Sequence, residues 1–482
     1  MGEHMKKRSI EVLAGVVLAS GVAVAGGNMT NEEPDVEPFV PVAKAEKKAD
    51  HNHKGLKHFH EPFCVCNKSP LFSKHKYDGK VHGYARIHHI FDGKDNGFDK
   101  DTGSTFGFGL KYDRHLFGGL SGGLEYYGVT NTGLTDDDDT RGIAYGQFMN
   151  KKKDTELEYG DLWGAHLTYK ADNFKVTVAR SQFDSPLAKM QITHVPNMFE
   201  YARLDTKLMG ADLSLSYITR MAYGSRSAAD YGLIGEFTGT GGMAQSQLKD
   251  IERGKYNTIS DIVGDDDVGG VAVFGMKKTF ENFKLEIWDY HIKDALNDIY
   301  LEVEYPFYDN KGYSAGLHFQ FINQNVDDKY DAIYGGNFYG VKLSTQIKKL
   351  KLNFAYNKKD DEGGFLNPSG ANPGYTSSIF SRNEYRSGVS AYKISALYPI
   401  AKGFKIIASY ADYGQSDMTL KRKGKPALAS QTDAKESNII LVYKPTKALT
   451  FKLFNAIRTS EFSTTKAERK QNHIRLIVNY SF

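Results

Sequence analysis

From about residue 80 to its C-terminus, the chain divides into short segments in which apolar and polar residues alternate, and this pattern constrains the fold most. Nine long polar connections and eight very short ones join the segments in turn, as outside loops and periplasmic turns join the strands of an outer-membrane barrel. The pattern predicts an all-β transmembrane antiparallel β-barrel of about eighteen strands. An even number of strands leaves both ends of the barrel on the periplasmic side.

The short connections hold residues that favour turns or tolerate positive φ. We place them at Asp113-Arg114-His115, Ala171-Asp172-Asn173, Met209-Gly210, Glu281-Asn282, residues 309–312, Lys348-Lys349, Ala401-Lys402-Gly403 and Pro445-Thr446-Lys447. The long loops are expected near residues 92–103, 128–158, 184–197, 222–268, 293–298, 324–334, 359–387, 414–435 and 459–468.

The last segment of the chain shows the alternation clearly. One face carries Ile474, Leu476, Val478, Tyr480 and Phe482, whereas Arg475, Asn479 and Ser481 lie on the other, with Ile477 as an exception. A solvated open sheet would alternate in the same way. However, open sheets rarely exceed about ten strands, so a larger number favours closure. We therefore expect this strand to pair with the first one, near Tyr84.

The N-terminus resembles an export signal. Lys6-Lys7-Arg8 precedes an apolar run over residues 12–19 and the small-residue cleavage site Ala23-Val24-Ala25. The run is shorter than the roughly 20 residues of a spanning helix, although an uncleaved anchor is the alternative. The sequence thus predicts a signal peptide at 1–25, a disordered periplasmic tail with a His/Cys-rich tract at 26–78, and the barrel at 79–482.

Composition narrows the class further. The 482 residues include 25% charged residues, the mean hydropathy is −0.48, and no other long apolar run could span a membrane as a helix. The 30 Tyr and 29 Phe, against 2 Trp, fit aromatic girdles at the two membrane interfaces. A net charge of +4 lacks the concentrated basic face that a nucleic-acid partner would require.

One local motif carries a family resemblance. Residues 179–187 (Ala-Arg-Ser-Gln-Phe-Asp-Ser-Pro-Leu) and 195–200 (Val-Pro-Asn-Met-Phe-Glu) resemble a signature of OprD-like porins, particularly the ε-proteobacterial type. Ala179 and Ser185 replace the usual Gly and Thr, and residues 192–194 lack the family's common Asp/Arg pair. The resemblance implies an eighteen-stranded barrel whose third loop narrows the pore. Its constriction residues here would be Asp184, Ser185, Pro186, Leu187 and Pro196.

A water-filled barrel with such a constriction would pass small hydrophilic solutes, selected by size and charge. By strand phase, the basic residues most expected to line the pore are Arg86, Arg203, Arg220, Lys342 and Arg475. The resemblance adds Arg180 and implies a basic ladder that guides carboxylates. Glu302 and Glu304 also face inward, so we expect a modest preference for anions and carboxylates. A bulge of one residue would reverse any of these assignments.

The tail contains an unusual cluster of metal-binding residue types. Four His and both Cys fall within residues 51–66, at His51, His53, His58, His60, Cys64 and Cys66. Imidazole and thiolate are preferred ligands of zinc and copper, although the two Cys could instead form a disulfide or bond to another chain. The barrel itself requires no cofactor.

These features predict a non-enzymatic porin in the bacterial outer membrane. Its expected partners are outer-membrane lipid and lipopolysaccharide, small-molecule solutes and the barrel assembly machinery, without nucleic acid, in a monomer or trimer. The alternatives are a surface adhesion or structural barrel and a barrel hydrolase. The sequence contains no Gly-x-Ser-x-Gly or His-Glu-x-x-His motif.

Overall fold

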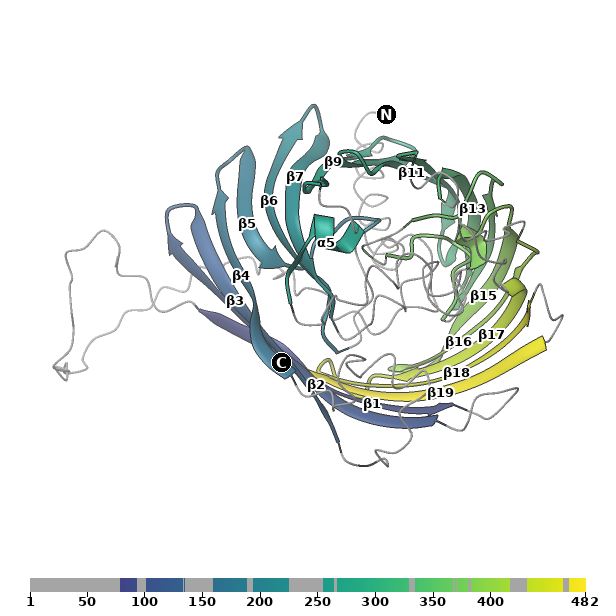
Figure 1. Ribbon diagram of the computed structural model, residues 1–482. Helices are drawn as coiled ribbons and strands as arrows, with labels where there is room; N and C mark the ends of the chain where they lie inside the picture. The colour runs from purple at the N-terminus through teal and green to yellow at the C-terminus, as the bar shows by residue number, and fades with distance from the viewer. Residues whose placement is uncertain are drawn as a thin grey trace, which may run out of the picture.

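The computed structural model describes residues 79–92, 101–132, 134, 159–188, 194–224, 255–263, 267–328, 334–366, 369, 371–379, 383–416, 431–462 and 468–482. Within these ranges the strands form a single antiparallel sheet that closes on itself as a ring (Figure 1). The predicted signal peptide and tail lie outside the described residues, so the domain boundaries there stay predictions.

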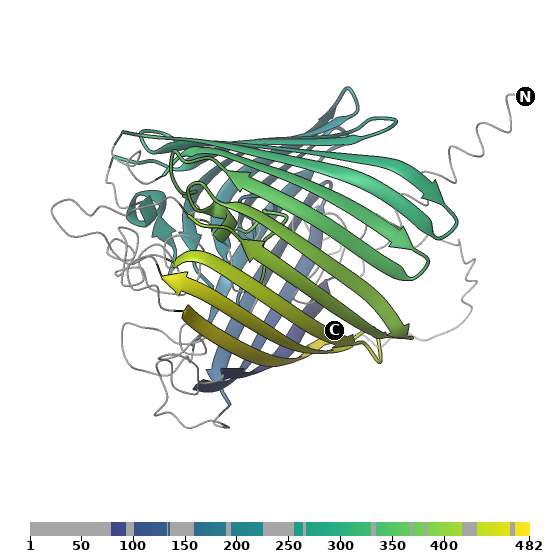
Figure 2. The same ribbon diagram turned by 90° about the vertical axis from the view of Figure 1, so that its right-hand side faces the viewer.

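The barrel wall has eighteen strands, and the nineteenth strand, β8, is a two-residue addition. The prediction of about eighteen antiparallel strands is therefore confirmed. The strands are tilted against the barrel axis in the side view (Figure 2). Their bounds are β1 Lys80–Asp92, β2 Asp101–Phe117, β3 Leu120–Asn131, β4 Tyr159–Lys170, β5 Phe174–Ser181, β6 Met198–Leu208, β7 Ala211–Ala222, β8 Asn257–Thr258, β9 Val271–Thr279, β10 Lys284–Ile292, β11 Leu296–Asn310, β12 Tyr313–Val326, β13 Gly336–Ile347, β14 Leu350–Lys359, β15 Ser390–Ala401, β16 Phe404–Tyr413, β17 Gln431–Tyr443, β18 Leu449–Phe462 and β19 Glu468–Ser481.

The first and last strands close the ring. β1 and β19 pair in antiparallel register from Tyr84 opposite Ser481 to Asp92 opposite His473. Beyond this ladder, the backbone N–H groups of Gly83 and Phe482 each donate to the carbonyl of the other, at 2.9 and 3.0 Å. The predicted pairing near Tyr84 is confirmed, and the C-terminal residue itself takes part in closure.

The short turns match the predicted positions with one exception. The connection between β2 and β3 was predicted at Asp113-Arg114-His115, but β2 continues to Phe117 and turns at Gly118-Gly119. A register shift between His115 and Phe117 lets the ladder continue, and Gly118 adopts a φ of +54°, which glycine tolerates without strain. Asp113, Arg114 and His115 are polar enough for a turn, but they belong to β2 and pair with Gly123, Gly122 and Ser121 of β3.

The two faces of the wall differ as the alternation predicts. On β7, Leu215 and Tyr217 are 58% and 49% exposed on the outer face, whereas Ser214 and Ser216 are buried on the inner face. Along this part of β7 the outer face is therefore apolar and the inner face is polar.

One short excursion interrupts the wall after β7. β8 pairs with the upper end of β7, and β9 pairs with the same strand from Ile218 downward. Helix α5 (Ile259–Val263) follows β8 in the chain and precedes β9. It lies inside the ring in Figure 1. Its buried residues pack on an inner apolar cluster that includes Phe183 and Trp288. No helix in the described ranges is long and apolar enough to cross a membrane.

Candidate functional site

The third loop, which joins β5 to β6 over residues 182–197, enters the barrel from the β6 and β10 side. Phe183 and Leu187 lie in the inner apolar cluster with Trp288. The Leu187 N–H donates to the Tyr290 hydroxyl at 3.2 Å, and the Arg203 guanidinium donates to the Asp184 carbonyl at 3.3 Å. These contacts hold the start of the loop against β6 and β10. Ser185 is buried and Pro186 is half-buried in the same stretch.

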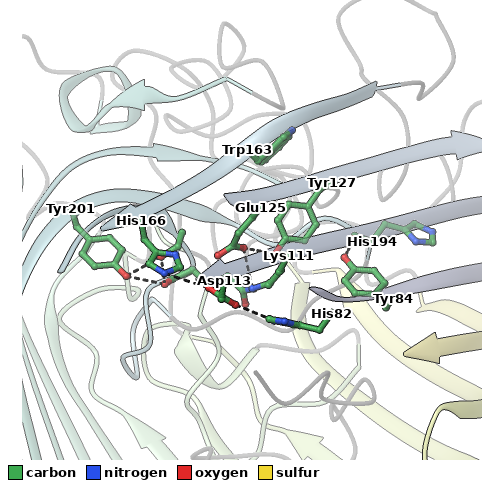
Figure 3. A network of polar contacts seen from close by, with 12 residues as sticks. His82, Tyr84, Lys111, Asp113, Glu125, Tyr127, Trp163, His166, His194 and Tyr201 are labelled. Carbon is green, nitrogen blue, oxygen red and sulfur yellow. Dashed lines mark hydrogen bonds and ion pairs between the residues drawn. The ribbon is translucent and has the colours of Figure 1, made fainter. Parts of the chain in front are cut away.

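The end of the third loop rests on β1 and β2. The His194 ring lies 2.6 Å from the Thr105 hydroxyl and 4.2 Å, between centroids, from the His88 ring. Tyr84 donates a hydrogen bond to the His194 carbonyl (both residues are labelled in Figure 3). Gly107 provides the space, because a Cβ there would come within 2.3 Å of the His194 ring. β1 and β10 lie almost half-way around the ring from each other, so the described ends of the third loop contact widely separated parts of the inner wall.

Pro196 completes the return of this loop to the wall. It is buried, and a Cβ added to Gly224 would lie 1.9 Å from the Val195 carbonyl and 2.6 Å from the Pro196 carbonyl. Gly224 therefore allows the two backbones to approach closely. The structure thus places all five predicted constriction residues, Asp184, Ser185, Pro186, Leu187 and Pro196, inside the barrel.

A second loop also folds inward, which the sequence did not reveal. The seventh loop connects β14 to β15 over residues 360–389. Its central stretch bonds to inward-facing groups of several strands. These bonds run from Tyr375 to Glu302 (2.7 Å), Gln320 to the Pro373 carbonyl (2.9 Å), the Thr376 N–H to Asn357 (2.7 Å), Lys393 to the Ser377 carbonyl (2.5 Å) and Tyr413 to the Thr376 carbonyl (2.6 Å). The loop is thereby fixed against β11 to β16.

The third and seventh loops touch each other. The Asn197 side-chain amide donates to the Ser369 carbonyl at 3.3 Å. The described parts of the two loops therefore meet inside the barrel. The contacts that hold them there are made by polar side chains and backbone groups.

Basic side chains gather where the third loop meets β1, β18 and β19. Arg86 donates from Nε to the Asn479 side chain at 2.9 Å, and Arg475 donates from Nε to the His473 ring at 3.3 Å. Lys452 and Arg475 both approach the face of the Phe454 ring. Burial, and then the charges of Arg86 and Arg475, hold the pKa of His194 well below its usual value. The field at this part of the wall is therefore positive.

The opposite part of the inner wall carries paired charges. Glu286 and Glu304 on β10 and β11 bond to Lys277 at 2.9 Å and Lys284 at 3.1 Å respectively. Further round, Lys111 pairs with Glu125 at 3.0 Å, and Asp113 lies between His82 and His166 (Figure 3). The lysine partners of Glu286, Glu304 and Glu125 offset their charges, whereas Glu302 accepts hydrogen bonds from Tyr300 and Tyr375 and keeps its negative charge.

Lys342 lies between these two regions. Its ammonium sits 4.4 Å above the centre of the Tyr375 ring, the same tyrosine that bonds to Glu302. This arrangement links a predicted pore residue to the seventh loop. Arg86, Arg203, Lys342 and Arg475 thus all face inward.

Arg180 and Arg220 lie on the other face. Arg180 pairs in register with Ala165 and shares the strand face of Val178, which is 59% exposed. Arg220 follows an extra residue, Thr219, at a register shift that moves it out of phase with Ser216. Both arginines contact Glu200, which lies on the outer face of β6. By strand register, Arg180 and Arg220 therefore lie on the outer face of the wall and not on the inner face predicted for them.

The predicted metal ligands lie outside the described residues. Within the described part of the chain, no three His, Cys, Asp or Glu side chains gather in a way that could hold a metal ion.

Comparison with known proteins places the fold. The sequence matches no family model and no curated protein. Solved structures, however, match most of the chain. OccAB4 of Acinetobacter baumannii has a TM-score of 0.65 at 12% identity, covering 84% of this chain and 98% of its own.

Two structures from Pseudomonas aeruginosa agree with it. OccK9 (OpdG) gives a TM-score of 0.64 at 14% identity over 84% of this chain and 99% of its own. OpdK, solved with vanillate, gives 0.61 at 14% identity over 84% and 98%. The protein is therefore a closed eighteen-stranded barrel with an OprD-like fold, the fold of OprD/Occ porins. At these identities the likeness shows the fold, and the function rests on the site.

Proposed function

We propose that the protein is a channel of the bacterial outer membrane that passes small hydrophilic solutes, with a modest preference for anions and carboxylates. The observation that carries this proposal is the pair of inward loops, which narrow the lumen beside a basic wall. A structural barrel has no need to fix two loops across its interior through so many polar contacts. The outward apolar face supports a location among membrane lipids.

The charges support the sign of the preference. Arg86, Lys452 and Arg475 converge where the third loop meets the wall, and His194 is held neutral among them. Lys277 and Lys284 neutralise Glu286 and Glu304, while Glu302 stays charged beside Tyr375, over whose ring the Lys342 ammonium lies. A passing anion would therefore meet a net positive field on one side and repulsion mainly from Glu302 on the other, which limits the preference to a modest one.

The motif at residues 179–200 supports a finer placement among OprD-like porins of the ε-proteobacterial type. We further propose that the protein acts as a monomer or trimer and requires no cofactor. Vanillate, an aromatic carboxylate, is present in the solved structure of OpdK. We propose aromatic carboxylates as a candidate class of solute for the present protein. Conduction rather than catalysis is proposed, and the barrel assembly machinery is the partner that would insert such a chain.

Single-channel recording in a planar bilayer tests the proposal. The purified protein should give steady ohmic current steps in KCl, and the reversal potential in a KCl gradient should have the sign of a chloride preference. Vanillate added to one side should reduce the current by entering the constriction. Absence of current steps from folded protein would contradict the channel, and a potassium preference would contradict the selectivity alone.

The predicted zinc or copper binding by the His/Cys tract is a separate proposal. Purified full-length protein should carry one of these metals, measured by elemental analysis. A Cys64→Ser, Cys66→Ser variant should lose the metal. Equal metal content in both proteins would contradict the proposal.

A further inference from the structure

The start of the third loop rests on a stack of aromatic and basic side chains at the inner wall. The Arg203 guanidinium on β6 lies 5.4 Å from the centre of the Phe183 ring and 5.9 Å from the centre of the Trp288 ring. Both distances are within the range of a cation–π interaction. Phe183 is the second residue of the loop, whereas Trp288 lies on β10. One guanidinium therefore connects the loop to a strand of the wall.

Hydrogen bonds at its edge fix the orientation of Arg203. Its Nε donates at 2.7 Å to Asp205, which lies two residues further along the same face of β6. Lys175, opposite Asp205 on β5, bonds to the same carboxylate at 2.9 Å. The Arg203 Nη1 donates to the Asp184 carbonyl of the loop at 3.3 Å. A planar guanidinium can bond along its edge while its faces contact aromatic rings, and a lysine ammonium cannot combine the two.

The wall holds Trp288 in place on its own side of the stack. The indole N–H donates to Glu286 at 2.6 Å, and Lys277 bonds to the same carboxylate at 2.9 Å. The ring lies against β9 at Gly275, where an added Cβ would come within 2.5 Å of it. Trp288 is 1% exposed and belongs to the same apolar cluster as Phe183. The loop thus docks onto an aromatic ring whose position the wall has already set.

The contacts of Arg203 differ from those expected of a charge that lines the pore. Asp205 offsets the charge of Arg203, whose side chain is 20% exposed. The remaining contacts join the guanidinium to the backbone and the first aromatic ring of the loop. These contacts hold the loop whether or not a solute is present.

We propose that Arg203 is the positioning residue of the third loop. It anchors the start of the loop to Trp288 and so sets how far the loop extends into the lumen. The planar guanidinium is required for this role, because charge alone does not reproduce the stack. The anchor itself is argued from contacts only, whereas its effect on the width of the channel rests on the proposed function.

Fluorescence quenching of Trp288 tests the anchor. The chain contains two tryptophans, so a Trp163→Phe background leaves Trp288 as the only one. In this background, Arg203→Lys keeps the charge but loses the stack, and acrylamide quenching should increase at least threefold as the loop leaves the ring. Arg220→Lys, on the outer face of β7, should leave quenching unchanged. Equal quenching in Arg203→Lys and its background would overturn the proposal.

A charge-balanced variant separates the anchor from the local field. Arg203→Gln with Asp205→Asn removes one charge of each sign and should increase the quenching of Trp288 as much as Arg203→Lys does. Quenching at the background level in this variant would likewise overturn the proposal. Every variant must keep the heat-dependent mobility of a folded barrel.

Single-channel conductance measures the consequence for the lumen. Arg203→Lys and the charge-balanced variant should each raise the conductance at least 1.5-fold, and Arg220→Lys should not. Conductance equal to wild type despite increased quenching would overturn the role of Arg203 in setting the width. Absence of current steps from all these proteins, wild type included, would contradict the channel, and quenching alone would then decide whether Arg203 anchors the loop.

Discussion

Replacing Arg475 by Gln should weaken the anion preference that we propose for the channel, without changing the fold. Arg475 faces inward from β19 beside Phe454 and His473, and its neighbours Arg86 and Lys452 remain. The substitution keeps a side chain that can bond to His473 and removes one charge. The expected change is therefore electrostatic.

The magnitude follows from Coulomb's law. An anion passing about 6 Å from the guanidinium in water gains about 0.7 kcal/mol, which screening at 0.1 M salt reduces to about 0.4 kcal/mol. That energy enriches anions and depletes cations about twofold each, so the permeability ratio of chloride to potassium should fall roughly fourfold. At 1 M salt, where the screening length is about 3 Å, the change should fall to less than about 1.5-fold.

Reversal potentials in KCl gradients measure this ratio, and Arg180→Gln is the matched control. Both changes remove one arginine charge, but the register places Arg180 on the outer face. The control should therefore retain the wild-type ratio at both salt concentrations. An unchanged ratio in Arg475→Gln, or an equal loss in Arg180→Gln, would refute the assignment of the inner and outer faces.

Three further changes probe the two inward loops. Gly107→Ala places a Cβ against the His194 ring and should displace the end of the third loop, so single-channel conductance should rise; conductance equal to wild type would contradict the contact. Tyr375→Phe removes the bond to Glu302, at a cost of about 1 to 3 kcal/mol for a bond to a charged group, and should increase current fluctuations while thermal unfolding of the barrel stays the same. Because the pKa of His194 is lowered from 6.5, the stability of the docked loop is present above pH 6.5 and is lost as pH falls below it. Conductance should therefore rise in acid for wild type and stay constant for His194→Gln, and parallel pH profiles would show that another group titrates.

Strand number and closure could be predicted because they depend on periodicity along the whole chain. A single misplaced turn leaves the count unchanged, as the shift from Asp113-Arg114-His115 to Gly118-Gly119 shows. The final strand was recognisable because its apolar residues alternate almost without interruption. The strand count and the alternation of apolar residues both draw on many positions, so one misassigned residue or turn does not change them.

The facing of individual residues depends on local register, which one inserted residue reverses. Counting by two from Ser214 and Ser216 assigns Arg220 to the inner face, but Thr219 is an extra residue at the register shift. Nothing in the residue types around Thr219 indicates this bulge. Arg203 and Lys342 kept their predicted facing because no shift separates them from the neighbouring strand residues that set the phase.

The inward course of the seventh loop was also not predictable from its residues. Tyr375 and Ser377 are polar enough for an exposed loop. They lie inside because Glu302, Lys393 and Tyr413, distant in the sequence, provide partners there. The third loop could be anticipated through its resemblance to a known motif, whereas the seventh loop depends on tertiary contacts alone.

The pairing of Gly83 with Phe482 has a consequence for folding. β1 pairs with β2 on one side and with β19 on the other, so its second pairing must wait until the end of the chain has been made. Until then the sheet has a free edge whose backbone N–H and C=O groups lack partners. Contacts between such distant residues form slowly, and open edges meanwhile favour aggregation. The ring can therefore close only after β19 is available to pair with β1, and a chain shortened by this strand would remain an open sheet.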